Sequence, residues 1–159
     1  MQALDAFDRK LLSIVQKNAE LTTTELGERV GLSASAVQRR LKRLRSDGVI
    51  TAYVAIVDPA KVGNPTHFVV GLEVDREHPE VLARLRTWLA KEDSVQHVFY
   101  ATGANDFVLV VTAPSIQDYD VLMSRLLADN PSVRRFTTNV VLGVHKRTSF
   151  IPVPGTEET

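Results

Sequence analysis

Residues 32–48 read LSASAVQRRLKRLRSDG, and this stretch has the pattern of a single amphipathic helix. Val37, Leu41 and Leu44 are spaced so that they share one face of a helix, where they point at a core. Gly48 is suited to end the helix, because glycine is the usual residue just after a helix C-terminus. The stretch therefore predicts one helix with a buried apolar stripe.

The face opposite this apolar stripe is polar and strongly basic. Such a face suits the DNA major groove, in which arginine contacts guanine or phosphate, glutamine contacts adenine and serine contacts either. The candidate DNA-binding residues are Thr22, Ser33, Ser35, Gln38, Arg39, Arg40, Lys42 and Arg43. One of the two serines also caps the helix. A solvated basic helix face is the alternative interpretation, since lysine and arginine are common on protein surfaces.

A second, shorter helix precedes the basic one. Thr22 and Glu25 have the spacing of a capping box, Leu26 and Val30 point inward, and a glycine ends the segment. A helix, a short turn and a second, basic helix form the helix-turn-helix pattern, in which the second helix enters the groove. Residues 5–15 predict a third helix, which is needed to cover the other two.

The remainder of the chain predicts a linker and a second domain with an internal repeat. The apolar run 49–57 is extended, and it either pairs as a small wing or leaves the DNA-binding domain as a strand. Proline and glycine at 58–65 indicate the linker. Strand, helix and strand then occur twice, which is the βαββαβ plan of a ferredoxin-like fold. The expected strands are 67–74, 95–102, 107–112 and 133–144, and the expected helices are 79–90 and 115–128.

The predicted fold class is α+β, with an N-terminal three-helix winged helix-turn-helix and a C-terminal ferredoxin-like domain. The expected domains are 1–60 and 61–150, followed by a flexible tail over 151–159. The two helices of the second domain cover one face of its sheet. The other face, for which Phe68 and Val70 are available, needs a partner, and a homodimer packed sheet on sheet supplies one.

Charge and composition narrow the class of protein. The chain of 159 residues has a net charge of zero, but residues 1–60 carry nine Lys and Arg against seven Asp and Glu. The basic excess is therefore local to the predicted DNA-binding domain. The absence of cysteine excludes disulfides and thiolate metal sites. Neither a signal peptide nor a membrane span is predicted, so the cytoplasm is the expected location and no membrane partner is expected.

Four motifs occur together in this chain. They are Leu4-Asp5-x-x-Asp8, Leu32-Ser33-x-Ser35-x-Val37-x-Arg39-Arg40-Leu41-x-Arg43-Leu44, Gly48-Val49-Ile50, and Gly103-x-x-Asp106-Phe107 before an apolar strand. In combination they resemble the Lrp/AsnC family, also called feast/famine regulators, over about residues 4–150. The resemblance implies double-stranded DNA and an amino-acid effector as partners, with no other cofactor. It also implies dimers that associate further, to tetramers or octamers.

The resemblance also implies an effector site. In the family, the turn that corresponds to residues 103–106 lies at a contact between dimers, where a small amino acid binds. Turn N–H groups can hold its carboxylate and Asp106 its ammonium group. The implied effector-binding residues are Phe99, Gly103, Ala104, Asn105, Asp106, Ile116, Asn139, Val140 and Val141. The residues alone are also consistent with a plain hairpin turn.

The sequence predicts a sequence-specific, amino-acid-responsive transcriptional regulator, and two other classes of function are alternatives to it. Ferredoxin-like dimers include enzymes, but the four histidines are scattered and no phosphate-binding loop or nucleophile motif occurs. The chain is therefore predicted not to be an enzyme and to have no metal site. The second alternative is an architectural protein that organises DNA without an effector.

Overall fold

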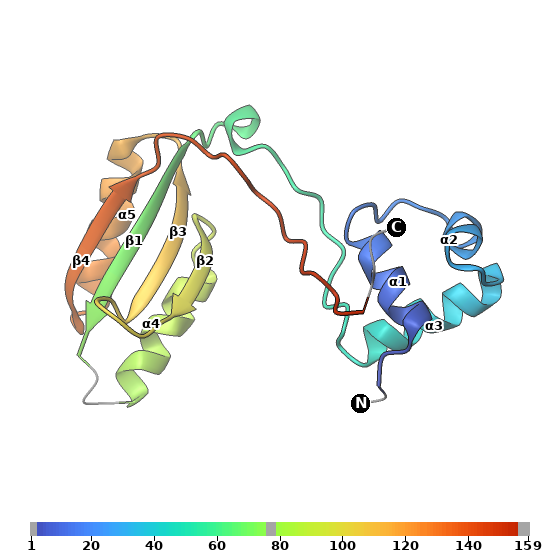
Figure 1. The fold of residues 1–159 in the computed structure, drawn as a ribbon. Helices are drawn as coiled ribbons and strands as arrows, with labels where there is room; N and C mark the ends of the chain where they lie inside the picture. The colour runs from blue at the N-terminus through green and yellow to red at the C-terminus, as the bar shows by residue number, and fades with distance from the viewer. Residues whose placement is uncertain (1–2, 76–78, 156–159) are drawn as a thin grey trace. The chain divides into compact units, whose positions relative to one another are not determined.

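A computed structural model describes residues 3–75 and 79–155, which form two compact units (Figure 1). One unit joins Met1–Ala55 with Lys146–Thr159, and the other is Ile56–His145. The sequence predicts the first boundary near residue 60, whereas the contacts divide the chain between Ala55 and Ile56. The chain therefore passes between the units twice, and the first unit is discontinuous in sequence.

Three helices form the core of the first unit. They are α1 (Ala6–Val15), α2 (Thr23–Val30) and α3 (Ala34–Ser46). The N-caps Asp5 and Thr22 each form a complete capping box, and Ser33 rather than Ser35 caps α3. Their apolar stripes meet in one core, as helical periodicity predicts. The buried residues of this core are Leu11, Val15, Leu26, Val30 and Val37.

The turn between α2 and α3 depends on a glycine within α2. A Cβ atom at Gly27 would lie 2.4 Å from the Leu32 carbonyl oxygen, so the turn can approach α2 this closely only at a glycine. The Gly27 carbonyl also accepts hydrogen bonds from the N–H groups of Gly31 and Leu32, at 2.8 and 2.9 Å. These contacts fix the direction in which α3 leaves α2.

The apolar run after α3 forms no strand in the described part of the chain. The N–H groups of Val49 and Ile50 both donate to the Leu44 carbonyl. Residues 51–58 are exposed and belong to none of the four strands of the sheet. A short 3-10 helix, η1 (Pro59–Val62), follows.

The second unit has the predicted βαββαβ order. Its elements are β1 (Thr66–Val74), α4 (Pro79–Lys91), β2 (Val95–Tyr100), β3 (Phe107–Ala113), α5 (Ile116–Asp129) and β4 (Val133–Val140). The strands are antiparallel in the order β2-β3-β1-β4, and both helices lie on one face of the sheet (Figure 1). β4 ends earlier than the predicted residue 144, because Pro65, which has no N–H group, precedes its partner strand.

The face of the sheet that α4 and α5 cover holds the core of this unit. Phe68 and Val70 are fully buried there, together with Leu72. The prediction that Phe68 and Val70 are available to the open face is therefore wrong. Successive residues of a strand point to opposite faces of the sheet. The open face therefore carries the residues of β1 that alternate with Phe68, Val70 and Leu72, together with the residues that pair with them on the neighbouring strands. Its apolar residues are Val69, Phe99, Val108 and Val110.

The segment 146–155 belongs to the first unit and lies on α1. The Gln16 side chain pairs with the backbone of Ile151: its Nε2 donates to the Ile151 carbonyl at 3.1 Å, and its Oε1 accepts from the Ile151 N–H at 2.8 Å. Arg9 Nη1 donates to the Pro154 carbonyl at 2.7 Å. Side chains of α1 therefore satisfy backbone groups of this segment.

These contacts fall on the described part of the tail over 151–159, whose flexibility stays a prediction. Backbone groups that have protein partners are held in place, and the Lys17 ammonium group adds a contact 5.3 Å from the centre of the Phe150 ring. Residues 156–159 lie outside the described residues.

Candidate DNA-binding surface and effector turn

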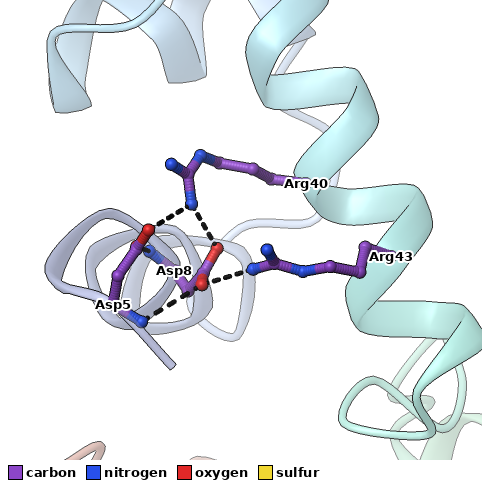
Figure 2. A network of polar contacts seen from close by, with 4 residues as sticks. All are labelled: Asp5, Asp8, Arg40 and Arg43. Carbon is purple, nitrogen blue, oxygen red and sulfur yellow. Dashed lines mark hydrogen bonds and ion pairs between the residues drawn. The ribbon is translucent and has the colours of Figure 1, made fainter. Parts of the chain in front are cut away.

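Two arginines of α3 bind one buried carboxylate of α1, that of Asp8 (Figure 2). Arg40 Nη1 donates to Asp8 Oδ1 at 2.9 Å and to Asp5 Oδ2 at 2.7 Å. Arg43 Nη2 pairs with the second oxygen of Asp8. A buried carboxylate is tolerated only when opposite charges or hydrogen bonds compensate for its lost hydration. The network therefore holds α3 against α1 at a fixed angle and register.

The electrostatics of the network favour its charged form. The N–H group of Asp8, and then the Arg40 guanidinium, hold the pKa of Asp5 below its ordinary value. Hydrogen bonds to Asp5 and Asp8 raise the pKa of Arg40. At neutral pH the contact between Arg40 and Asp5 is thus an ion pair.

This network divides the predicted DNA-binding residues into two sets. Arg40 and Arg43 are partly buried and bind α1, so they position the helix. A second set of four side chains from the predicted list is exposed along α3. These side chains are Ser35, Gln38, Arg39 and Lys42. Their chemistry is that of groove contacts: one arginine and one glutamine for base edges, with lysine and serine for phosphates.

The hydroxyl groups of Thr22 and Ser33 are used within the unit. Thr22 Oγ1 donates to Glu25 Oε2 at 2.7 Å and accepts from the Glu25 N–H at 3.2 Å. The Thr22 N–H, which also donates to Glu25, is the main cause of the lowered pKa of that carboxyl group. Ser33 Oγ accepts from the Ala36 N–H at 3.3 Å. Both side chains are exposed, and both begin a helix.

Sequence reasoning missed the role of Asp8, although a signal for it exists. Asp8 lies three, four and seven positions before Leu11, Leu12 and Val15, which are buried on the inner face of α1. A carboxylate on such a face requires a cationic partner from another element. Arg45, which is exposed on the last turn of α3, is a further cation outside the predicted set.

The turn 103–106, which is the predicted effector turn, is anchored to the end of β1. Asp106 is buried; its N–H donates to the Leu72 carbonyl at 2.8 Å, and its Oδ2 accepts from the Val74 N–H at 2.8 Å. Gly103 and Ala104 are exposed. The carboxylate of Asp106 thus holds the turn on the sheet, and its predicted contact with the ammonium group of a ligand stays a prediction.

The predicted effector residues lie at two opposite ends of the sheet. Phe99, near the end of β2, and the turn 103–106 share one end. At the other end, Ile116 begins α5 just after β3, and the Val141 N–H donates to the His67 carbonyl near the start of β1. Asn139 and Val140 pair with the same part of β1. One copy of the chain therefore does not bring the whole set together.

Residues 3–75 and 79–155 show neither a metal-binding cluster nor a membrane-spanning helix. These residues contain no group of three side chains able to hold a metal ion. None of their helices has the length and apolar character needed to cross a membrane.

Comparisons with known proteins agree with this division into units. Residues 4–51 match a family described as winged helix-turn-helix DNA-binding, and residues 67–150 match the Lrp/AsnC ligand binding domain. An uncharacterised HTH-type transcriptional regulator, y4tD, from Sinorhizobium fredii is 41% identical over 150 residues, which cover 94% of this chain and 89% of that protein.

Solved structures give the same picture over nearly the whole chain. An AsnC family transcriptional regulator from Agrobacterium tumefaciens superposes with a TM-score of 0.88 and 30% identity, covering 94% of this chain and 97% of that one. The complex of the transcriptional regulator NMB0573 from Neisseria meningitidis with L-Met gives a TM-score of 0.88 and 28% identity, covering 96% and 98%. The chain belongs to the Lrp/AsnC family and is a transcriptional regulator with a DNA-binding helix-turn-helix and a ligand-binding domain.

Proposed function

We propose that this regulator reads a specific DNA sequence with the exposed stripe of α3, binds a small amino acid at the turn 103–106, and acts as a homo-oligomer in the cytoplasm. The observation that carries the DNA-binding part is the contrast within α3. Arg40 and Arg43 fix the helix to the buried Asp8, while Arg39 and neighbouring polar residues stay exposed. A rigidly held helix with an exposed polar stripe can place side chains at base edges.

The DNA-binding proposal is tested on a duplex selected from a random pool. Arg39→Ala should weaken binding to this duplex by about 1–3 kcal/mol if the arginine reads a base. Lys42→Ala should weaken specific and non-specific binding alike and reduce the salt slope by about one unit, as expected for a phosphate contact. Arg84→Ala, which removes an exposed arginine of α4, is the control. Parent-like affinity and salt slope for both α3 variants would show that this stripe is not the reader.

The proposal for the effector is supported by the family and by the exposure of the turn. The relative from Neisseria meningitidis is described as a complex with L-Met. In this chain, Gly103 and Ala104 expose the backbone of a turn that Asp106 holds in place. Exposed N–H groups of a turn can bind a carboxylate. We propose that a second copy supplies Ile116 and residues 139–141, which lie at the other end of the sheet.

Self-association is proposed from the open face of the sheet. This face carries apolar side chains, among them Phe99, which is 54% exposed. An apolar face of this kind is commonly covered by a second copy of the same chain. Sedimentation of the protein at micromolar concentration should therefore give a dimer or a larger species, and a monomer would contradict the proposal.

The effector is sought by measuring the melting temperature with each of the twenty amino acids. A ligand that binds only the folded state must stabilise it, so at least one amino acid should raise the melting temperature. Light scattering with that amino acid then shows whether the oligomer changes size. If no amino acid shifts the melting temperature, the effector part of the proposal is wrong, whereas the DNA-binding part is unaffected.

A further inference from the structure

Asn105, the residue before Asp106, lies flat against the backbone of β1. A Cβ atom built at Gly71 would be 2.4 Å from Asn105 Cγ and Oδ1 and 2.5 Å from its Nδ2. All three overlaps involve the amide group of one side chain, and Gly71 is in the middle of β1, opposite Val108 and Thr137. The amide therefore occupies the space that a side chain at residue 71 would fill.

The geometry points to Gly71 as a positioning residue for the effector turn, an inference that rests on the proposed amino-acid site. Two hydrogen bonds between Asp106 and the backbone of β1 hold the end of the turn, and neither of them involves residues 103–105. The contact of Asn105 with Gly71 is a third anchor, and it lies on the open face of the sheet. It sets how far Gly103 and Ala104 stand from the sheet, and thus where their N–H groups meet a small zwitterionic ligand.

Glycine is otherwise an unfavourable choice at this position. A glycine within a strand weakens it, because the residue has high backbone entropy when unfolded and packs no side chain. Gly71 does not have a positive φ angle, so its backbone accepts alanine without strain. The close approach of Asn105 is the feature that requires glycine. Since the overlapping atoms are the end of a side chain, Gly71→Ala should displace that amide rather than unfold the sheet.

The test is a double-mutant cycle on the full chain with Gly71→Ala, Asn105→Ala and both together. The first measurement is amide hydrogen exchange over residues 101–107 without ligand. Gly71→Ala should speed exchange there when Asn105 is present and leave it unchanged when residue 105 is alanine. Gly143→Ala is the matched control, because a Cβ there would meet only His145 Nε2, at an ordinary 3.8 Å.

The second measurement is the affinity for the amino acid that stabilises the parent. Gly71→Ala should lower this affinity by about tenfold or more in the Asn105 background, with little further loss in the Asn105→Ala background. Equal losses in both backgrounds, or parent-like exchange and affinity in Gly71→Ala, would overturn the inference. If no amino acid binds the parent, the proposed effector function fails, and the exchange measurement still decides whether Gly71 positions the turn.

Discussion

Each unit contains one buried aspartate, and the two carboxylates are satisfied in different ways. Asp8 is 0% exposed and binds two guanidinium groups that come from another helix. Asp106 is 8% exposed, and its Oδ2 accepts a hydrogen bond from the backbone N–H of Val74. The first contact requires a negative charge, whereas the second requires a hydrogen-bond acceptor.

The two aspartates thus illustrate two ways in which a protein can hold a helix or a turn that is proposed to bind a partner. In the DNA-binding unit, an ion pair between side chains fixes a whole helix, so its strength depends on the charge of Asp8 and on the reach of Arg40 and Arg43. In the effector unit, a bond to the backbone fixes a turn, so an uncharged acceptor at position 106 can make the same bond. Substitution by asparagine, which keeps size and an acceptor but removes the charge, distinguishes the two.

The largest effect is expected for Asp8. Asp8→Asn and Asp8→Ala should each lower the free energy of unfolding of the DNA-binding unit by about 3 kcal/mol, because either change leaves two arginines without their buried partner. Hydrogen exchange of peptides from α1 and α3 in the full chain measures this loss, and peptides from β1 and β3 serve as the internal control. If the asparagine variant exchanges like the parent, Asp8 acts as an acceptor and the contrast with Asp106 disappears.

A smaller and unequal effect is expected for Asp106. Asp106→Ala should cost about 2 kcal/mol, since it leaves the buried Val74 N–H without this acceptor. Asp106→Asn should cost less than half as much, because its amide oxygen can still accept that hydrogen bond. The exchange rate of the Val74 amide in the two variants reports the difference. Equal losses for alanine and asparagine would mean that the charge of Asp106 matters as much as that of Asp8.

The smallest effect is expected for the pH dependence of stability, to which Asp5 contributes in the DNA-binding unit. The folded-state pKa of Asp5 lies below the ordinary 3.8, so its contribution to stability is present above the unfolded pKa and is lost as pH falls through the folded pKa. Protection of α1 should therefore decrease as the pH falls below the ordinary 3.8. Asp5→Asn keeps a good N-cap residue but removes the titrating group, so its protection should decrease less. Identical pH profiles for parent and variant would contradict this role of Asp5.

Periodicity predicted the elements well, because each pattern is local. The spacing of Val37, Leu41 and Leu44 identified the inner face of α3, and the repeat of strand, helix and strand identified the ferredoxin-like unit. The same reasoning applied to β1 was incomplete. Alternation puts Phe68 and Val70 with Leu72 on one face and His67 with Glu73 on the other, so the core face could have been identified from the strand itself.

What the sequence did not predict within the candidate sites are contacts between residues that lie far apart in the chain. Arg40 and Arg43 are chemically suited to DNA, and only the approach of α1 shows that their charges are already paired. The carboxylate of Asp106 similarly depends on the end of β1. The contact between Gln16 and Ile151 uses the backbone N–H and carbonyl of Ile151. Since every residue type except proline has both groups, no local sequence pattern predicts this contact.

The discontinuity of the DNA-binding unit has a consequence for synthesis on the ribosome. The core residues of α1, α2 and α3 all precede Ile56, so these helices can pack as soon as they emerge. The segment that docks on α1 follows the entire effector unit in the chain. At about 5–20 residues per second, it becomes available several seconds after the helices. A chain that stalls within the ligand-binding unit therefore displays α3, the proposed DNA-reading helix, while lacking the contacts at Arg9 and Gln16 that complete its unit.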